Sequence, residues 1–391
     1  MKPRASSAPQ PRAGASRDAL PELVERHVAS CVRGHGTLAR SVKLPPLDPT
    51  LRPGVSVAIC THRRAASLRR LLDSIASQTR LPDAVLVIDA SPDTDTEMAI
   101  RREPAPWDLG DRLLYVRVGG PLRGLTKQRN VAISLMETDL VAFFDDDIVL
   151  EWDCLRELEK VHRTSMPPPV GVAARIVNEQ TRPSSRWRLR RLLGIVPTLR
   201  PGRYCRSGMS IPWAFAGPTE AVVEGEWLPG GATMWRTQLA RTIRFYEGFR
   251  GYGNGEDVEF SLRAGACGRL LVAGRAQVKH LQDDAGRPDT RAMAYDSARN
   301  AYYIHGTCLV DRSWLDVAYF IYAFAVDTMV LALATLLPGD RSARWRFVQG
   351  RLGFLLDLAC NRLTPNSARV GRWTTNEICA LPADDRIGRG R

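Results

Sequence analysis

Short apolar runs alternate with amphipathic segments over residues 54–150 of this chain. The apolar runs predict buried strands at residues 55–60, 84–89, 113–118 and 140–144. The segments between them carry apolar residues at helical spacing and predict helices at residues 66–77 and 126–136. Strands interleaved with helices favour a mostly parallel sheet with right-handed crossovers, flanked by helices. The predicted fold class is therefore α/β.

The pattern changes outside this region. Residues 1–50 are rich in Pro, Ala, Ser and Arg and predict a mostly disordered N-terminal extension, with at most one short helix at residues 19–30. Residues 151–285 are rich in glycine and less regular, and the pattern beyond them is helical. We therefore expect an α/β domain at residues 54–285 and a helical, membrane-associated region at residues 286–391.

The last predicted strand ends in three adjacent carboxylates, Asp145, Asp146 and Asp147. Three like charges repel one another, so their collection at a strand end indicates a cation or a ligand that neutralises them. Ligands bind at the carboxyl ends of the strands in open α/β sheets, and a divalent metal holding a diphosphate fits this place. If the strand continues, Asp145 and Asp147 point the same way. A solvated acidic turn is the alternative.

Composition narrows the class of partner. With 391 residues, of which 44% are hydrophobic, the chain can form one large domain with appendages. The net charge of +13 indicates an anionic partner, and because no zinc finger or RNA-binding signature is present, we expect no nucleic-acid partner. The eight cysteines form no C-x-x-C pair, and residues 1–20 lack the apolar stretch of a secretory signal. These features predict reduced thiols in a cytosolic compartment.

Six motifs, in the right order, resemble those of the family 2 glycosyltransferases, which have the GT-A fold. They occupy residues 55–64, 87–91, 124–130, 145–147, 227–231 and 255–259, and His280 follows them. Residues 124–130 read Gly-Leu-Thr-Lys-Gln-Arg-Asn and resemble the family's "Gly-Leu-Ser … Ala-Arg-Asn" segment, and the acid triplet resembles its Asp-x-Asp motif. The resemblance covers about residues 55–281 and implies a GT-A type sheet that binds a nucleotide sugar.

The resemblance also implies roles for individual residues. Those implied to bind the nucleotide sugar are Thr61, Arg63, Asp89, Arg129, Asp145, Asp146, Gly230 and Gly231. Those implied to hold Mn²⁺ or Mg²⁺ are Asp147, Asp145 and His280. Asp257 is the implied general base, which takes the proton from the acceptor hydroxyl, and Glu256 beside it is the other catalytic candidate.

Several of these residues have ordinary structural alternatives. Asp89 could form a turn with the residues that follow it, and Arg129 could be one more surface arginine in an arginine-rich chain. His280 could be a core residue with satisfied hydrogen bonds. Glu256 and Asp257 follow glycine and could simply begin a helix, where the helix dipole stabilises acidic side chains.

Two later segments bear on the acceptor. Residues 182–206 hold eight arginines and no acid, interleaved with Trp187 and several leucines. That composition suits contact with anionic lipid or with a lipid-pyrophosphate acceptor, and a solvated surface helix is the alternative. Residues 315–337 are apolar over membrane length apart from Asp316 and Asp327. Because a central aspartate is costly in a bilayer, a buried or interfacial helix is favoured over a membrane span.

Together these features predict an inverting, metal-dependent glycosyltransferase. It would move a sugar from a nucleotide-sugar donor to a glycan or lipid-linked acceptor, in the synthesis of a cell-surface polysaccharide or glycolipid. We expect it in the cytoplasm, peripheral on the inner face of the cell membrane. Two alternatives remain at this point: a metal-dependent nucleotidyltransferase, and a catalytically inactive module that binds glycans or membranes.

Overall fold

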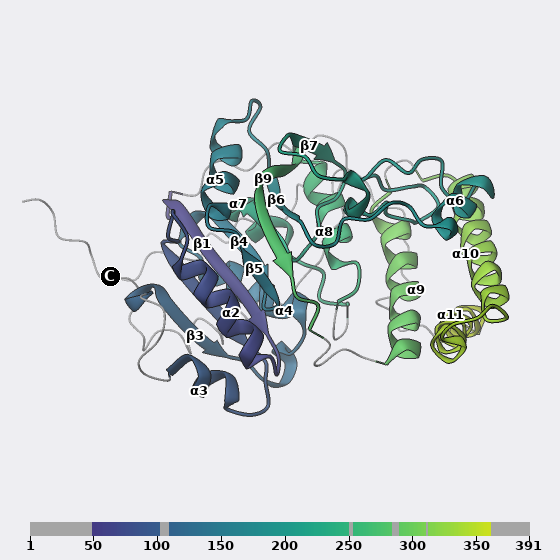
Figure 1. Ribbon diagram of the computed structural model, residues 1–391, viewed down its shortest axis with the longest axis horizontal. Helices are drawn as coiled ribbons and strands as arrows, with labels where there is room; N and C mark the ends of the chain where they lie inside the picture. Colours follow the sequence, from purple (N-terminus) through teal and green to yellow (C-terminus); the bar gives the residue numbers. More distant parts are fainter. Residues whose placement is uncertain (1–48, 102–108, 250–252, 284–288, 310–311, 361–391) are drawn as a thin grey trace, which may run out of the picture. The chain divides into compact units, whose positions relative to one another are not determined.

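The computed structural model describes residues 49–101, 109–249, 253–283, 289–309 and 312–360. The expected N-terminal extension, with its short helix, lies almost entirely outside this part. Within it, helices surround a single nine-stranded sheet, and three long helices follow the last strand (Figure 1). The predicted α/β class and the helical C-terminal region are both confirmed.

The sheet has the strand order β3-β2-β1-β4-β8-β6-β9-β5, and β7 pairs with β9 outside this path. Its strands are β1 (Arg52–Thr61), β2 (Ala84–Asp89), β3 (Leu113–Arg117), β4 (Thr138–Asp145), β5 (Ile148–Leu150), β6 (Gly171–Ile176), β7 (Val222–Gly225), β8 (Ala232–Arg236) and β9 (Leu270–His280). In this described sheet, six of the nine strands (β1, β2, β3, β4, β6 and β9) run in one direction, and the other three run antiparallel to them. The sheet is therefore mostly parallel.

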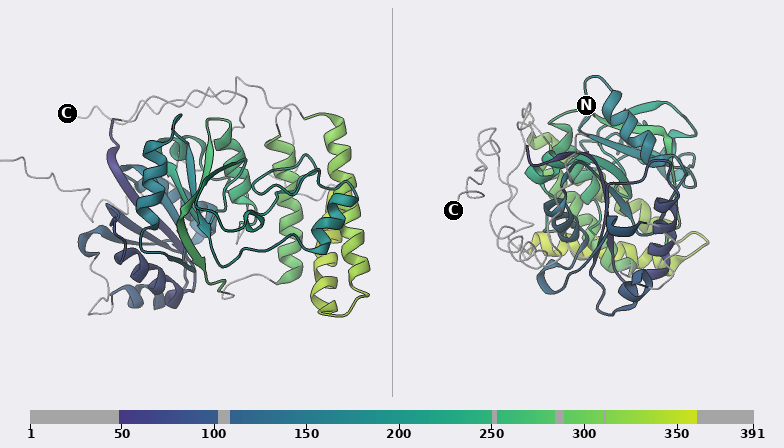
Figure 2. Two further views of the ribbon diagram at one scale, coloured as in Figure 1. Left: turned by 45° about the horizontal axis from the view of Figure 1, so that its top comes forward. Right: turned by 90° about the vertical axis from the view of Figure 1, so that its left-hand side faces the viewer.

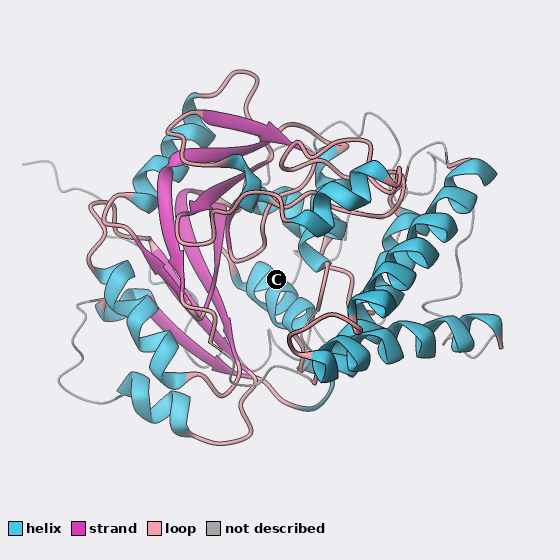
Figure 3. Cartoon of the chain, turned by 45° about the vertical axis from the view of Figure 1, so that its right-hand side comes forward, coloured by secondary structure: helices cyan, strands magenta, loops and turns pink. Residues whose placement is uncertain are grey.

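Helices pack on both faces of the sheet (Figure 3). The helices of the described residues are α2 (Ala65–Ala76), α3 (Asp95–Arg101), α4 (Leu125–Leu135), α5 (Cys154–Thr164), α6 (Ser185–Leu192), α7 (Thr237–Ile243), α8 (Glu256–Gly265), α9 (Thr290–Thr307), α10 (Trp314–Ala334) and α11 (Arg341–Ala359). Apolar residues of α2 and α5 join the side chains of alternate strand residues in the largest buried cluster. On the opposite face, Phe143 of β4 and Trp235 of β8 pack edge-on against Phe245 and Phe260.

The central strands match the sequence prediction closely. The predicted strand at residues 84–89 coincides with β2, and the predicted helices at residues 66–77 and 126–136 each begin one residue earlier, as α2 and α4. Strand β1 begins three residues earlier than expected because the backbone N–H of Arg52 donates to the carbonyl of Glu137 at 2.9 Å. Both neighbours of β1 run parallel to it, so the ends of β1, β2 and β4 come to one edge of the sheet.

The arginine-rich segment at residues 182–206 does not lie free on the surface. Ile195 and Val196 are fully buried in a cluster with Ala323 of α10, and Trp187 and Leu193 pack partly buried against it. The sequence had offered no core for these apolar residues, and that interpretation was wrong because α10, more than a hundred residues later in the chain, supplies the core. Leu192 remains exposed.

Helices α9, α10 and α11 begin at polar side chains that cap them. Asp289 accepts hydrogen bonds from the backbone N–H groups of Arg291 and Ala292, and Ser313 forms a reciprocal capping box with Asp316. Asp340 caps α11 through the N–H of Ala343, at 2.9 Å. Helix α11 packs against both α9 and α10. The pattern that predicted a helical region therefore corresponds to three capped helices that share a core.

Helix α10 is long and apolar enough to cross a membrane, by its length and composition. Of its 18-residue apolar stretch, 33% is buried inside the protein. Its two carboxylates are both paired: Asp316 bonds to Arg206, and Asp327 bonds to three arginines. Exposed apolar residues on the outer face of α10 include Leu315, Ile321 and Leu333. The part of the chain that the structure describes also holds six cysteines, and none of them forms a disulfide.

Gly350 should set the distance between α11 and α9. A Cβ added at Gly350 would lie 2.2 Å from the carbonyl oxygen of Arg291 and 2.8 Å from the Cβ of Ala294. We therefore expect Gly350→Ala to lower the free energy of unfolding by roughly 1–3 kcal/mol, the usual cost of overpacking. Chemical denaturation measures this change.

Gly353, one turn later on α11, provides the matched control. A Cβ there would meet Tyr295 at 3.7 Å, an ordinary van der Waals contact. Gly353→Ala should therefore leave the protein as stable or make it more stable by up to about 1 kcal/mol, because alanine favours a helix over glycine. Equal effects of the two substitutions would contradict this account of the helix contact.

Candidate active site

The three acids that follow β4 separate into two groups. Strand β4 ends at Asp145, and residues 146 and 147 form a turn. Asp145 accepts a hydrogen bond from Arg129, whereas Asp146 and Asp147 both accept from Arg64. The expectation that Asp145 and Asp147 point the same way was wrong because the strand does not continue past Asp145.

Arg64 provides the positive charge nearest to the last two acids. Its Nη1 lies 3.0 Å from Oδ1 of Asp146 and 3.3 Å from Oδ2 of Asp147, and its Nη2 donates to the carbonyl of Asp283 at 2.6 Å. Asp146 also accepts from the hydroxyl of Thr61 at 2.7 Å. Burial raises the pKa of Asp146 to about 7, against the opposing effects of Arg64 and Thr61. Because burial is the largest cause of this shift, Asp146 is costly to keep charged even with Arg64 and Thr61 beside it.

Asp147, His280 and Glu179 form a hydrogen-bonded chain. Nε2 of His280 lies 3.2 Å from Oδ1 of Asp147, and its Nδ1 lies 2.6 Å from Oε1 of Glu179. Hydrogen bonds to these two carboxylates raise the pKa of His280 to about 10. Burial would raise the pKa of Asp147, but the hydrogen bond and the charge of His280, together with the charge of Arg64, outweigh it and the net shift is downward. Both ring nitrogens of His280 have hydrogen-bond partners, as the structural alternative held, and its role as a metal ligand stays a prediction.

Arg129 joins the sheet edge to the start of α8. Its Nη1 lies 2.7 Å from Oε1 of Glu256, its Nη2 lies 3.0 Å from Oδ1 of Asp145, and Nη2 also donates to the carbonyl of Gly230 at 3.2 Å. The side chain is 2% exposed and stacks over the rings of Phe143 and Phe245. The alternative of a surface arginine was therefore wrong.

Burial disfavours the charged form of Arg129, yet its pKa is raised above the ordinary value because Glu256 and Asp145 stabilise the cation. The described part of the chain thus contains a buried ion triad at the point where β4 and α8 meet. This triad was not expected from the sequence, which had placed the guanidinium against the nucleotide.

The loop at Gly230 and Gly231 crosses directly over the carboxylates. A Cβ at Gly230 would lie 2.9 Å from both Cβ of Asp257 and Oε1 of Glu256, and one at Gly231 would lie 3.1 Å from Oδ2 of Asp145. The glycines are needed for this close approach. The same loop contacts Asp145, Glu256 and Asp257, which the sequence had placed in two separate motifs.

Asp257 lies in the first turn of α8 and is held by two backbone donors. Its Oδ2 accepts from the N–H of Gly230 at 3.2 Å, and its Oδ1 accepts from the N–H of Val258 at 2.8 Å. Burial raises the pKa of Asp257, and burial together with the charge of Asp257 raises the pKa of Glu256. A carboxylate with a raised pKa and fixed orientation can act as a general base. Asp257 also lies in the first turn of a helix, as the structural alternative held, and this position is compatible with the role of a base.

The predicted nucleotide contacts at the ends of β1 and β2 lie beside one another. Asp89 is fully buried, with Oδ1 accepting from the N–H of Ser91 at 2.7 Å and Oδ2 from the hydroxyl of Tyr115 at 2.8 Å. Asp89 therefore does form a turn, as the alternative held. Arg63 is exposed and has a positive φ of 59°, and its backbone N–H donates to Oγ of Ser91 at 2.8 Å.

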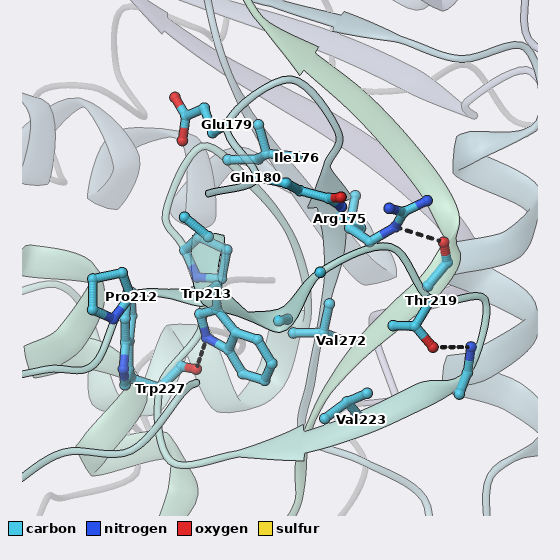
Figure 4. A pocket seen from close by; sticks show the side chains of 17 residues that line it. Arg175, Ile176, Glu179, Gln180, Pro212, Trp213, Thr219, Val223, Trp227 and Val272 are labelled. Atoms are coloured by element: carbon cyan, nitrogen blue, oxygen red, sulfur yellow. Dashed lines mark hydrogen bonds between the residues drawn. The ribbon is translucent and has the colours of Figure 1, made fainter. Parts of the chain in front are cut away.

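A cavity of about 160 Å³ lies among residues of β6, β9 and the segment at residues 212–229 (Figure 4). Trp213 and Trp227 line it, and Nε1 of Trp213 donates to the carbonyl of Trp227 at 2.8 Å. Nε1 of Trp227 and Nε2 of Gln180 are buried without a hydrogen-bond partner among the described residues. Glu179, the partner of His280, also lines the cavity. Indole surfaces combined with unpaired donors suit a ligand that is both apolar and rich in hydroxyls.

Three residues of this site had no role in the sequence interpretation. Arg64 lies inside a recognised motif, but the sequence does not distinguish it from Arg63 beside it. Gln128 donates to the carbonyls of Thr61 and Ile88 and thereby ties α4 to two strands. Glu179 lies in a loop after β6, where no pattern marks it. Only the fold brings it to His280.

No three His, Cys, Asp or Glu side chains within the described residues are gathered in an arrangement that would hold a metal ion. Of the three predicted metal ligands, Asp147 and His280 lie in contact, while Asp145 is turned to Arg129. The predicted ligand set therefore stays a prediction.

Comparisons with known proteins bear on part of this chain. The family model described as "Glycosyl transferase family 2" matches residues 56–216, a segment that contains most of β1, all of β4 and the acid triplet. The match identifies a glycosyltransferase domain over these residues, which make up less than half of the chain. A comparison with curated protein sequences finds no match.

Two solved structures have similar folds. One is a mannosyltransferase, PcManGT from Pyrobaculum calidifontis in complex with GDP-Man and Mn²⁺, with 17% identity, a TM-score of 0.46, and coverage of 93% of this chain and 95% of that one. The other is S. aureus TarS, with 17% identity, a TM-score of 0.44, and coverage of 81% of this chain and 54% of that one. The domain is identified by the family match over residues 56–216 and not by these two similarities.

We expect Arg129→Gln to destabilise the protein severely. The substitution leaves Glu256 and Asp145 without their shared cation, and breaking a buried ion pair in this way costs about 3–5 kcal/mol. Lys127→Gln on the same helix is the matched control, because Lys127 donates to the exposed carbonyl of Pro121 and its loss should cost less than about 0.5 kcal/mol. Urea denaturation compares the two, and equal losses would contradict the role assigned to the triad.

Proposed function

We propose that the glycosyl transferase family 2 domain carried by residues 56–216 transfers a sugar, with inversion, from a nucleotide-sugar donor to an acceptor hydroxyl. The observation that supports this most is the bridge formed by Arg129. It holds Asp145, at the sheet edge, against Glu256 at the start of α8, so that Asp257 lies next to the edge where a donor would bind.

In this proposal Asp257 takes the proton from the acceptor hydroxyl. The attacking oxygen approaches the anomeric carbon from the side opposite the diphosphate, which departs with the nucleotide. The backbone N–H groups of Gly230 and Val258 orient both oxygens of Asp257, and its raised pKa makes the carboxylate a stronger base than an exposed aspartate. Glu256 is held by Arg129, so it is better suited to position this base than to replace it.

The residues around Asp147 fit a divalent cation in their chemistry. Asp147 and His280 present one oxygen and one nitrogen to each other at 3.2 Å, and Mn²⁺ accepts both donor types. We propose that Asp147 and His280 hold Mn²⁺ or Mg²⁺. When bound, the metal would stabilise the charge of the departing diphosphate.

The donor can be identified by ligand-dependent stability. We propose to heat the full chain with individual nucleotide sugars, with and without Mn²⁺. A ligand that binds only the folded protein stabilises it by an amount that grows with affinity. Protection by one nucleotide sugar, enhanced by Mn²⁺, is the expected result. No protection by any donor would favour the alternative of a catalytically inactive module.

Asp147→Asn should remove the Mn²⁺-dependent part of this protection. The amide keeps the shape of the side chain but loses the charge that a metal requires, and His280→Ala should cause a smaller loss with a changed preference between Mn²⁺ and Mg²⁺. Asp73→Asn, on the exposed face of α2, makes the same charge change away from the site and should behave as the unsubstituted protein does. Unchanged Mn²⁺ dependence in Asp147→Asn would remove Asp147 from the metal site.

Asp257→Asn should separate donor binding from transfer. A general base acts on the acceptor, so protection by the donor should stay near normal while transfer falls by roughly two to four orders of magnitude. Transfer is measured as labelled sugar moved from the donor that the protection screen identifies. If Asp257→Asn kept near-normal transfer and Glu256→Gln lost it, the base would be Glu256.

We also propose that the protein binds peripherally to an anionic membrane at the cytoplasmic face. Exposed apolar residues of α10, of α11 and of the turn between them, among them Trp314, Leu336 and Leu356, support this, as do exposed arginines of the α6 segment, including Arg188 and Arg191. The support from charge is weaker than the sequence suggested, because four of the eight arginines of residues 182–206 pair with acids of this chain.

Vesicle flotation tests this membrane proposal. Arg188→Gln/Arg191→Gln should weaken binding to anionic vesicles by up to about 30-fold, since each basic residue near such a surface contributes up to about 1 kcal/mol. The control Arg269→Gln/Arg275→Gln removes the same charge from exposed pairs of β9 and should have little effect. High salt should release the protein. Retention through an alkaline carbonate wash would instead indicate that α10 spans the membrane.

A further inference from the structure

A second cavity, remote in sequence from the catalytic motifs, lies among the C-terminal helices. It has a volume of about 240 Å³ and is lined by residues of α6, α9, α10 and α11, with a loop at residues 207–210. Figure 2 shows α6, in teal, lying against the yellow-green α10. Among the lining residues are Trp187, Phe320 and Phe347, so the wall is largely aromatic.

Three arginines surround one buried carboxylate at this cavity. Asp327 is 1% exposed and bonds to Arg190 at 2.8 Å, to Arg351 at 2.6 Å and to Arg186 at 3.2 Å. We call these four residues the Asp327 cluster. Its charges sum to +2, and no further acid is among the residues that line the cavity. A pairing that only fastened α6 and α11 to α10 would need one arginine from each, and α6 provides two.

The arginines are fixed but not fully satisfied. Arg351 is 8% exposed, its guanidinium stacks over the ring of Phe324 at 4.1 Å, and its Nε is buried without a partner among the described residues. Arg190 stacks over Trp187 at 4.4 Å. Burial lowers the pKa of Arg351, and Asp327 offsets this only in part. Surplus buried cations of this kind are stabilised when an anion enters.

The cavity is also connected to the catalytic end of the domain. Ser297 of α9 lines the cavity and accepts a hydrogen bond from the side chain of Asn254 at 3.2 Å, while Asn300 donates to the carbonyl of Asn254 at 2.8 Å. Asn254 lies two residues before Glu256, which begins α8, and three before Asp257. Towards the outside, α10 and α11 present exposed apolar side chains, including Ile321 and Leu352.

We propose that this cavity binds the phosphate group of a lipid, with Arg190 and Arg351 as its charged ligands and the aromatic wall against the first part of the hydrocarbon chain. Nε and Nη2 of Arg190 already bond to the two oxygens of Asp327, and Nη1 of Arg351 bonds to it as well, so the buried Nε of Arg351 is the donor without a partner among the described residues that a phosphate would meet. If the proposed function holds, on which this assignment rests, the lipid carries the sugar whose hydroxyl is the acceptor, and the phosphate is held on the side of α9 that contacts the loop before Asp257.

The test uses the full chain and farnesyl phosphate, a soluble short prenyl phosphate, with titration calorimetry as the readout. The expected result is binding of farnesyl phosphate and at least about tenfold weaker binding of farnesol, which lacks the phosphate. Arg351→Gln and Arg190→Gln should each weaken farnesyl phosphate binding about tenfold or more. Arg191→Gln, an exposed arginine on α6, is the control and should leave it unchanged.

Asp327→Asn should strengthen the binding of farnesyl phosphate, whereas the arginine substitutions should weaken it. It removes the internal counter-ion and leaves three arginines around a neutral side chain, so affinity for farnesyl phosphate should rise. A purely structural cluster would instead lose stability in this variant without any gain in affinity. Equal binding by the Arg351→Gln and Arg191→Gln variants, or equal binding of farnesol and farnesyl phosphate, would overturn the proposal.

Two further ligands identify the source of the phosphate. Inorganic phosphate that binds as tightly as farnesyl phosphate would overturn the lipid part of the proposal. Dihexanoyl phosphatidylglycerol that binds equally well would assign the site to membrane phospholipid and overturn the acceptor. Protection of the chain against thermal unfolding by the nucleotide-sugar donor is measured in parallel. If the donor protects the chain but farnesyl phosphate does not bind, only this inference fails. If farnesyl phosphate binds but no donor protects the chain, the proposed function fails.

Discussion

The buried ion pair between Arg129 and the carboxylates of Asp145 and Glu256 is the constraint on which the site depends. Asp145 belongs to the end of β4 and Glu256 to the start of α8, more than a hundred residues apart in the chain. Glu256 is buried, where a carboxylate is costly without a cation beside it, and the side chain of Asp145 is 35% exposed. Because one guanidinium satisfies both, the donor edge of the sheet and the candidate base are held at a fixed distance, and the glycine loop at residues 230 and 231 fits between them.

The acid triplet illustrates the same balance at a second point. Desolvation raises the pKa of Asp146, and Arg64 offsets only part of that shift. The three acids repel one another, and the structure offsets that repulsion with two internal cations, Arg64 at Asp146 and Asp147 and Arg129 at Asp145.

Much of the fold could be predicted from the chain alone, because β1, β2 and β4 are continuous apolar runs and α2 repeats its leucines at helical spacing. The roles of Asp147, His280 and Asp257 came from motif spelling, and the structure brings the first two into contact. What could not be predicted depends on tertiary contacts. Glu179 follows no pattern, Arg129 was expected against the nucleotide and lies in an ion triad, and Trp187 with Ile195 was expected to face lipid. Helix α10 supplies the core against which Trp187 and Ile195 pack. The same helix carries Asp327, whose charge was expected to oppose membrane insertion and which the structure pairs with three arginines.

The most direct test of the central claim is the identity of the product that leaves the nucleotide. The full chain is incubated with Mn²⁺ and a panel of nucleotide sugars, and the nucleotide products are separated by ion-exchange chromatography and weighed by mass spectrometry. An enzyme that breaks the bond between the sugar and the diphosphate releases a nucleoside diphosphate, and slow release should be measurable even when water replaces the acceptor. The account predicts a nucleoside diphosphate from one donor. Release of pyrophosphate or of a nucleoside monophosphate, or no product from any donor and acceptor mixture, would contradict it.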